Sequence, residues 1–347
     1  MNNITIRIDN IQPDPQDNRD WLLPVTWGAQ LPNSLDLRDY CTNIEDQLNI
    51  GSCTANATVG IAEMFLKSAP GAGVADTDLS RLFNYYISRE LIGPSWLTGD
   101  PGSTLRMALR AGNKAGIPLE SAWAYDPKNE NVKPPQSAYD DAANRKIGAY
   151  YRIPMIDPYS TALRPYTYEQ LMYQFMFALA QGYPILAAIV VGASLPGLPA
   201  GEVYRPVNGY ANKAIGGHAL VIVGYSVQAD GSVIFTVRNS WGSAWGDKGY
   251  FQCAGNALWI DAIDYWVVKS FAGWSQVGRD VTGNATPPTL SADQVRGAYA
   301  AMLGCQPATM DFDGARYWVN QPGAAVRDMY YAGMLRMQGL LDGSIKG

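Results

Sequence analysis

Apolar residues recur at helical spacing in the first half of the chain and at strand spacing in the second half. Between residues 53 and 67, the segment CTANATVGIAEMFLK places Ala57, Ile61, Met64 and Phe65 on one face of a predicted helix. Similar spacing predicts further helices over residues 79–91, 103–116 and 167–182. The last two segments end in glycine, which is common just past the C-terminus of a helix.

Short β-rich runs replace the helical pattern from residue 183 onward. They are YPILAAIVVG (183–192), GHALVIVGYSV (217–227), SVIFTVRNSW (232–241) and GYFQC (249–253). The middle two runs are joined by Gln228-Ala229-Asp230-Gly231, which predicts a hairpin loop. A helical half followed by a β half is typical of an α+β fold.

Polar and proline-containing stretches suggest where the chain divides. The predicted segments are an irregular N-terminal arm (1–30), a main folded domain (31–277), a linker (278–290) and a C-terminal helical module (291–347). The module begins with Leu290-Ser291-x-x-Gln294-Val295, which has the pattern of a capping box preceded by a hydrophobic staple residue.

Composition and charge make several function classes improbable. A hydrophobic share of 47% suits a globular protein with a full core. The net charge is −5 and no basic run stands out, which argues against a nucleic-acid partner. The sequence has neither a signal-peptide pattern nor an apolar segment long enough to span a bilayer. We therefore expect no membrane partner and a cytoplasmic start, and export within a particle or by a dedicated exporter stays open.

The four cysteines are sparse and form no CxxC pair. They are Cys41, Cys53, Cys253 and Cys305. With one histidine in the chain, the sequence predicts neither a disulfide framework nor a metal site, and no cofactor. All but Cys53 are interpreted as small buried hydrophobic residues.

Cys53 follows a Gly-Ser turn and opens a predicted helix. Cysteine reacts as the thiolate, and a helix N-terminus offers partial positive charge and free N–H groups that stabilise this anion. Gly51 leaves room for a substrate backbone. The side chain of Gln47 and the backbone N–H of Cys53 could together form an oxyanion hole. Taken alone, this segment fits a buried structural cysteine equally well.

A cysteine nucleophile requires a base, and His218 is the only histidine in the chain. Two glycines precede it, as a cleft would require, although histidines on apolar strands are more often structural. Asn239 could hydrogen-bond the far imidazole nitrogen and fix the ring. Trp241 and Trp245 could shield that hydrogen bond from water, and the alternative is that this Gly-Trp loop serves packing only.

The three segments together resemble the papain family of cysteine peptidases, and they occur in that family's order. They are Gln47-(x5)-Cys53, Gly217-His218-Ala219 and Asn239-Ser-Trp-Gly-x-x-Trp-Gly-x-x-Gly-Tyr250. The resemblance covers roughly residues 31–270. It implies a helical lobe carrying Cys53, a β-rich lobe carrying His218 and Asn239, and a cleft between them. It also implies that Gln47 donates a hydrogen bond to the oxyanion.

The sequence departs from the common pattern of the family at two positions near the nucleophile. Ile50 stands where a disulfide-forming cysteine is usual, and Thr54 replaces the usual aromatic residue. No long helical pro-segment precedes the domain. These features resemble the bacterial and viral branch of the family. Residues 1–30 are expected either to lie across the cleft or to pack beside it.

The resemblance also implies a set of substrate contacts. The predicted residues are Gly51, Gly102, Ser103, Ala188, Gly216, Ala219 and Trp241. Gly102 and Ser103 are expected to pair with the substrate backbone. Ala188, Gly216 and Ala219 are small and apolar, so we expect the second subsite to prefer a bulky hydrophobic side chain.

The C-terminal module loosely resembles a short helical module of bacteriophage tail proteins and secreted bacterial proteins. The residues that carry this likeness are Tyr299, Leu303, Gly304, Asp313, Gly314, Tyr317 and Trp318. We expect this module to dock the protein onto a larger assembly such as a virion. A generic helical appendage is the alternative.

Together the resemblances imply an endopeptidase acting on peptides or proteins through a Cys53 thioester, with His218 as base and Asn239 orienting its ring. The expected resting state is a thiolate–imidazolium ion pair. Two alternatives stay open: a catalytically silent papain-like scaffold within an assembly, and a hydrolase of peptidoglycan stem peptides.

Overall fold

The computed structural model describes most of the chain up to residue 282. The described residues are 11, 14, 17, 20–69, 76–155, 166–207, 212–273, 277–278 and 280–282. The chain groups into two compact units, one of residues 1–15 and 29–282, and one of residues 16–28 and 283–347. The predicted C-terminal module, with Cys305, lies outside the described residues.

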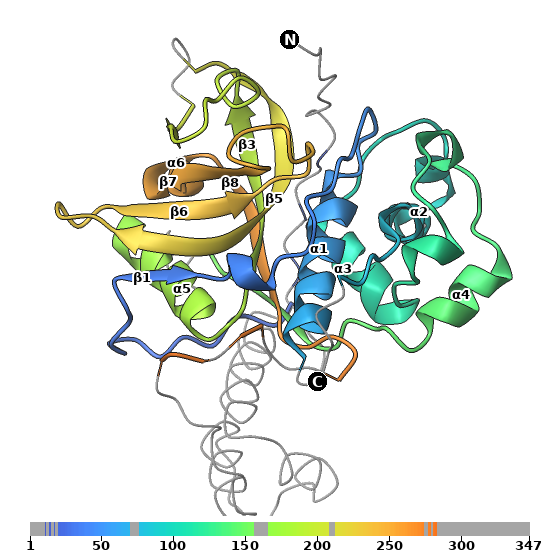
Figure 1. Cartoon of the computed structure of the whole chain (residues 1–347), viewed down its shortest axis with the longest axis horizontal. Coiled ribbons are helices and arrows are strands. Elements are labelled where there is room, and N and C mark those ends of the chain that lie inside the picture. The colour runs from blue at the N-terminus through green and yellow to red at the C-terminus, as the bar shows by residue number, and fades with distance from the viewer. Residues whose placement is uncertain are drawn as a thin grey trace, which may run out of the picture. The chain divides into compact units, whose positions relative to one another are not determined.

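Helices dominate the first part of the larger unit (Figure 1). They are α1 (Cys53–Ser68), α2 (Arg81–Ile92), α3 (Leu105–Lys114) and α4 (Gln136–Ala142), with the 3₁₀ helices η1 (Arg38–Tyr40), η2 (Pro94–Leu97), η3 (Glu120–Ala122) and η4 (Pro127–Asn129). The first three α-helices confirm the predicted helices to within two residues at each end. Short α4 was not predicted.

Side-chain caps fix where α2 and α3 begin. Ser80 accepts a hydrogen bond from the Phe83 N–H, and Thr104 accepts one from the Met107 N–H. These hydroxyls satisfy backbone donors that have no partner within the helix. Helix α3 ends just before Gly116, whose φ of 87° a residue with a side chain rarely adopts.

The second part of the larger unit is an eight-stranded sheet. Its strands are β1 (Ser34–Asp36), β2 (Tyr150–Arg152), β3 (Ile185–Gly192), β4 (Val203–Tyr204), β5 (Ala214–Val227), β6 (Val233–Arg238), β7 (Tyr250–Ala254) and β8 (Ala262–Val268). The order is β2-β8-β3-β5-β6-β7-β4, with β1 paired to β5. Every pair is antiparallel except β4 with β7. Helices α5 (Tyr168–Ala180) and α6 (Gly255–Ile260) pack against this sheet.

The α+β prediction is confirmed, but the two halves of the sequence are less separate than expected. Strand β1 precedes all the α-helices and still joins the sheet at β5, and β8 returns to pair with β3. The predicted hairpin between β5 and β6 is present, where the Gln228 N–H donates to the Ser232 carbonyl at 2.8 Å. Gly231 in this loop has a φ of 82°.

The helices meet the sheet along α1, which contacts β5 and β3 (Figure 1). Every residue of α1 from Cys53 to Phe65 is buried. Behind the helix, Arg238 on β6 donates to Thr42 Oγ1 at 3.1 Å and to the Asn43 carbonyl at 2.6 Å. A Cβ at Gly60 would lie 3.5 Å from the Arg238 guanidinium carbon, so this glycine allows close packing of helix and sheet. The start of α1 therefore has a fixed place beside β5.

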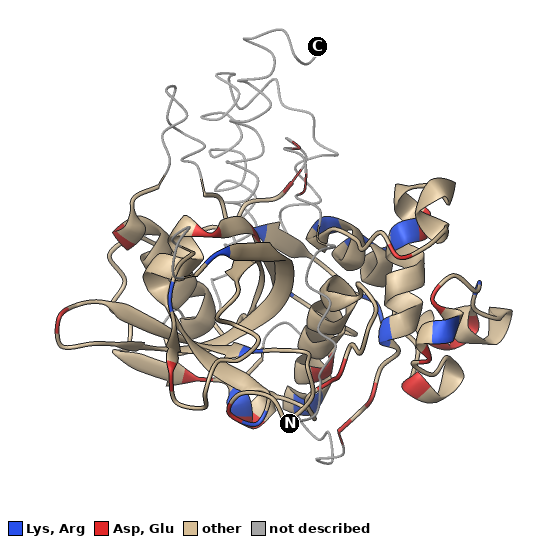
Figure 2. Cartoon of the chain, turned by 90° about the horizontal axis from the view of Figure 1, so that it is seen from above, with Lys and Arg blue, Asp and Glu red and all other residues tan. Residues whose placement is uncertain are grey.

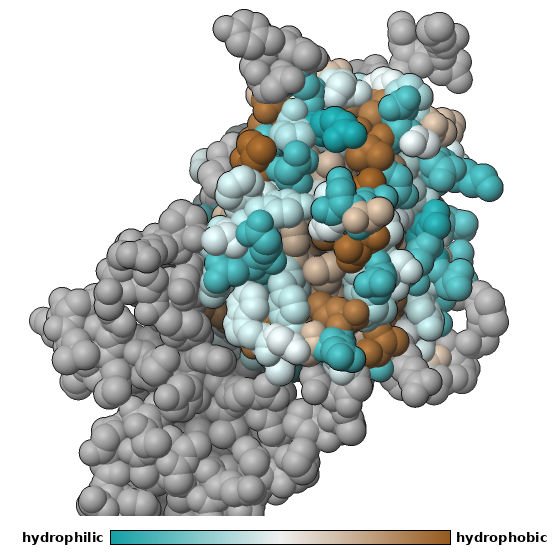
Figure 3. Space-filling model, turned by 90° about the vertical axis from the view of Figure 1, so that its left-hand side faces the viewer, coloured by the Kyte–Doolittle hydropathy of each residue, from teal (hydrophilic) through white to brown (hydrophobic). Residues whose placement is uncertain are grey.

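Positively and negatively charged side chains are interspersed among the described residues. In Figure 2, lysine and arginine alternate with aspartate and glutamate over the helices, and no extended basic face is visible in that view. Figure 3 shows small hydrophobic patches interspersed among hydrophilic residues on the side of the larger unit that carries the sheet. Within the described residues, no helix is both long and apolar enough to cross a membrane.

Candidate active site

Cys53 is the first residue of α1 and is 3% exposed. The preceding residue, Ser52, accepts two hydrogen bonds from Asn56 Nδ2, at its carbonyl and at its hydroxyl (3.0 and 2.9 Å). Burial raises the pKa of the Cys53 thiol to about 11, and the backbone N–H groups of Ala219 and Thr54 partly offset this rise. Ala219, whose N–H lowers the pKa of this thiol, is the residue after His218.

His218 lies in the middle of β5, opposite Ile189 on β3, and is fully buried. Its Nε2 is 2.8 Å from Asn239 Oδ1. Trp241 stacks on the imidazole with the ring centroids 4.8 Å apart, and Trp245 packs edge-on against Trp241. The structure thus brings together His218, Asn239 and the two tryptophans that the motif singled out. The tryptophans shield the histidine–asparagine hydrogen bond.

The environment of the two reactive groups favours their neutral forms. Burial lowers the pKa of His218 to about 4, partly offset by the hydrogen bond that its Nε2–H donates to Asn239, while the pKa of Cys53 is raised. Removal from water penalises a thiolate and an imidazolium alike. In this conformation burial therefore disfavours the charged forms that the expected ion pair requires.

Gln47 is fully buried between the nucleophile loop and the loop after β6. Its backbone N–H donates to the Ser240 carbonyl at 2.9 Å, and the Ser240 hydroxyl donates to its Oε1 at 2.8 Å. Its Nε2 faces the nucleophile loop, where it donates to the Ile50 carbonyl at 3.3 Å. Ser240, directly after Asn239, thus fixes which way the glutamine amide points.

The Asp100 carboxylate links Gly51 and Gly102, two of the residues predicted to contact the substrate. The Gly51 N–H donates to Asp100 Oδ2 at 2.8 Å, and Asp100 also accepts a hydrogen bond from the Tyr85 hydroxyl. The Gly102 N–H donates to the same hydroxyl at 3.2 Å. Sequence reasoning missed Asp100 and Tyr85, because an Asp-Pro-Gly turn and a helical tyrosine carry no local signal of this link.

Ala188 and Ala219 are direct partners across β3 and β5, and each is 1% exposed. Gly216 pairs with Val191 farther along the same two strands. These three predicted subsite residues therefore lie on one pair of strands, with Gly216 three residues from Ala219 along β5.

Ile11 of the N-terminal arm lies between the two sides of the predicted cleft. It forms a parallel bridge with Ser103, and a Cβ at Gly217 would collide with its side chain. Ile263 also approaches that position, and Ile11 itself is 7% exposed. Of the two expectations for the arm, the described part fits the one that places it across the cleft.

Asp14 anchors the arm at the start of α3. Its carboxylate accepts a hydrogen bond from the Arg106 N–H at 2.8 Å and lies 3.7 Å from the Arg106 guanidinium. Both side chains are at least nine-tenths buried. A helix N-terminus stabilises a negative charge, so this contact favours the docked arm.

Three carboxylates, Glu45, Glu63 and Asp78, lie within 4.8 Å of one another. The first two already have protein partners: Glu45 pairs with Arg81 at 2.9 Å, and Glu63 accepts hydrogen bonds from Thr42 and from the Leu79 N–H. Burial raises the pKa of Glu63 to about 8, which favours its protonated form at neutral pH. The cluster thus has the features of an internal network between α1 and its neighbours.

The chain is similar to several cysteine peptidases. A family profile described as papain family cysteine protease matches residues 31–268. An uncharacterized peptidase C1-like protein of Acanthamoeba polyphaga mimivirus is 31% identical over 256 residues, which are 72% of this chain and 75% of that protein. Mouse cathepsin K is 27% identical over 248 residues, 71% of this chain and 67% of its own length. The crystal structure of xylellain, a cysteine protease from Xylella fastidiosa, is 28% identical and superposes with a TM-score of 0.62, covering 76% of this chain and 98% of xylellain.

Proposed function

The chain belongs to the papain family of cysteine proteases, and we propose that it cleaves peptide bonds with Cys53 as nucleophile, His218 as general base and Asn239 as the residue that orients the imidazole. One observation carries this assignment. Nε2 of His218 is hydrogen-bonded to Asn239 Oδ1 at 2.8 Å, while Nδ1 has no hydrogen-bond partner among the described residues. Nδ1 is therefore the nitrogen available to the thiol.

The proposed reaction requires no group beyond these residues, Gln47 and a water molecule. The Cys53 sulfur attacks the peptide carbonyl carbon as the thiol proton passes to His218, which then gives that proton to the leaving amine. The oxyanion accepts hydrogen bonds from the Cys53 N–H and from Gln47 Nε2. Water then attacks the thioester carbonyl as His218 takes its proton, the C–S bond breaks to release the acid, and His218 returns that proton to the Cys53 sulfur.

Covalent labelling by an epoxide-type cysteine inhibitor tests the assignment of the nucleophile. We expect the label on Cys53 after release of the arm, because water then reaches that thiol, and none on Cys41 or Cys253, which stay buried in the core with raised pKa values. Peptide mapping by mass spectrometry reads the position. A chain that takes up no label after release of its arm would instead be a silent scaffold.

Substrate preference follows from the subsite walls. Ala188 and Ala219 offer only small methyl groups, and Ile11 of the arm already places a branched aliphatic side chain nearby. We expect a library of peptides to show a preference for bulky hydrophobic side chains at the second residue before the cleaved bond. A flat profile, or a preference for charged residues, contradicts this expectation.

We also propose that the arm inhibits the enzyme from within. Ile11 fills space between Ser103 and Gly217, which a substrate backbone and side chain would occupy. The backbone of Ile11 pairs with the backbone of Ser103 in the parallel direction. Because Gly217 directly precedes His218, the docked arm would also limit the access of water to the imidazole.

We further propose that residues 291–347 dock the peptidase onto a larger assembly such as a virion. The support is the loose likeness to phage tail modules at residues such as Gly304, Tyr317 and Trp318. Deleting residues 285–347 is expected to leave peptide hydrolysis unchanged and to reduce co-sedimentation with the particle. Undiminished co-sedimentation contradicts the docking role.

A further inference from the structure

The proposed oxyanion hole depends on residues 47–52, a loop that lies outside the helices and strands. Gln47 and Cys53 supply its two donors, and the residues between them form turns. Leu48 within this loop has a φ of 53°, in the left-handed region that residues with a side chain rarely adopt. Oxyanion donors act only when they stand about 2.7–3.1 Å from the developing charge. Contacts from outside the loop must therefore fix the distance between its two ends, and with it the spacing of the two donors.

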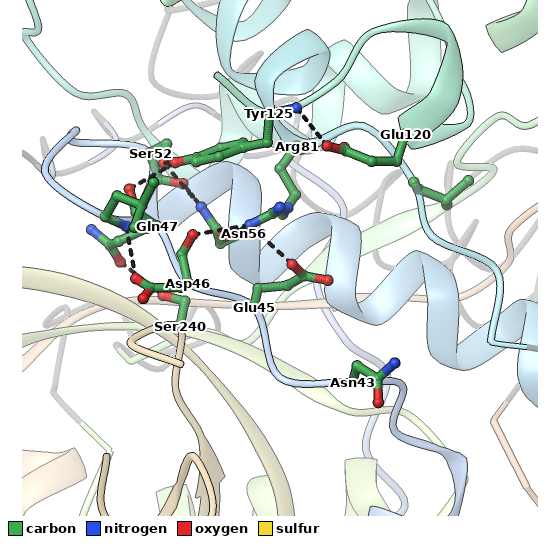
Figure 4. Close-up of polar contacts among 12 residues, drawn as sticks. Asn43, Glu45, Asp46, Gln47, Ser52, Asn56, Arg81, Glu120, Tyr125 and Ser240 are labelled. Carbon is green, nitrogen blue, oxygen red and sulfur yellow. Dashed lines mark hydrogen bonds and ion pairs between the residues drawn. The ribbon is translucent and has the colours of Figure 1, made fainter. Parts of the chain in front are cut away.

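Tyr125 contacts both ends of this loop through one hydroxyl group (Figure 4). The hydroxyl donates to the Gln47 carbonyl at 2.8 Å and lies 2.6 Å from Ser52 Oγ. A phenol has a single proton, so donation to Gln47 leaves its oxygen as the acceptor for the Ser52 hydroxyl. One group thus ties the residue that carries the side-chain donor to the residue before the nucleophile.

The ring of Tyr125 is itself held in place. The Arg81 guanidinium carbon lies 4.1 Å from the ring centroid, and the Tyr125 N–H donates to Glu120. Arg81 also contacts Asn56 Oδ1 at 3.2 Å and Glu45 at 2.9 Å, so the stacking cation is fixed to α1 and to the segment before Gln47 (Figure 4). Because burial raises the pKa of Tyr125 to about 12, its hydroxyl keeps its proton at neutral pH.

We propose that Tyr125 is a positioning residue that sets the spacing between Gln47 and the start of α1, and with it the geometry of the oxyanion hole. The hydroxyl acts through Gln47 and Ser52 and touches neither the substrate nor the reacting atoms. This inference rests on the proposed catalytic roles of Cys53 and Gln47.

Replacing Tyr125 by phenylalanine tests the proposal, because the ring stays on Arg81 while both hydrogen bonds are lost. Removing an oxyanion donor outright costs about 10²–10³-fold in kcat, so a displaced donor is expected to cost about 10-fold. KM is expected to change by less than about twofold, since the donor acts mainly on the transition state. Alkylation of Cys53 by iodoacetamide forms no oxyanion, so its rate should match the wild type.

Tyr139→Phe is the matched control. The Tyr139 hydroxyl has no hydrogen-bond partner among the described residues, so its loss should leave kcat unchanged. A wild-type kcat in Tyr125→Phe overturns the proposal, and so does a fall of kcat, alkylation rate and melting temperature together, which marks a purely structural role. Failure of the proposed function is seen separately, as peptide hydrolysis that survives Cys53→Ala.

Discussion

Replacing Cys53 by alanine is expected to reduce kcat for peptide hydrolysis by at least about 10³-fold, because the thioester then has no nucleophile. The fold should survive, since the change removes one buried sulfur at the start of α1 and leaves the hydrogen bonds from Asn56 to Ser52 in place. Hydrolysis of a fluorogenic peptide, and labelling by the epoxide inhibitor, measure the effect.

Cys41→Ala is the control for this variant. Cys41 is also buried, and its sulfur lies 3.9 Å from Met64 Sδ, away from the imidazole. The Cys41→Ala variant also removes one sulfur atom from the core, and it is expected to leave both peptide hydrolysis and labelling of Cys53 intact. Hydrolysis that persists in Cys53→Ala, or that disappears in Cys41→Ala with an unchanged melting temperature, contradicts the assignment of the nucleophile.

Replacing Ile11 by glutamate is expected to raise kcat/KM about 10²-fold. The carboxylate would be buried beside Gly217 and Ile263 without a partner, which costs several kcal/mol and favours release of the arm. If about 1% of the wild-type molecules have a free cleft, full release increases the active fraction about 100-fold. Steady-state hydrolysis of a short peptide measures this change.

The pH dependence of thiol alkylation provides a second readout of the same variant. With the arm docked, burial holds the pKa of Cys53 near 11 and that of His218 near 4, so the thiol is neutral and unreactive at pH 7. Access of water lowers the first pKa and raises the second, because both charged forms become solvated. Alkylation in Ile11→Glu is therefore expected to begin at lower pH than in the wild type.

Val132→Glu controls for the added charge. Val132 is 48% exposed, so the same substitution there should change neither hydrolysis nor alkylation. Equal activity of Ile11→Glu and the wild type, with equal melting temperatures, contradicts an inhibitory arm. Asp14→Asn, which removes the charge paired with Arg106, is expected to activate in the same direction but less.

Features that depend on neighbours along the chain could be predicted from the sequence. The apolar period of residues 53–67 predicted α1, and with it the position of Cys53 at a helix start. His218 and Asn239 lie on the two sides of a hairpin, so their meeting follows from strand pairing that a short loop enforces. The order of the three motifs, together with these local elements, was enough to indicate the α+β fold and the family.

Features that depend on distant segments were decided only by the tertiary structure. Tyr125 reaches Gln47 and Ser52, and Asp100 reaches Gly51, from distant loop positions where no local pattern indicates the contact. The sequence also carried no sign that burial disfavours the charged forms of the thiol and the imidazole. Burial sets those pKa values, and burial belongs to the packed molecule, including the arm residue Ile11, rather than to any segment of its sequence.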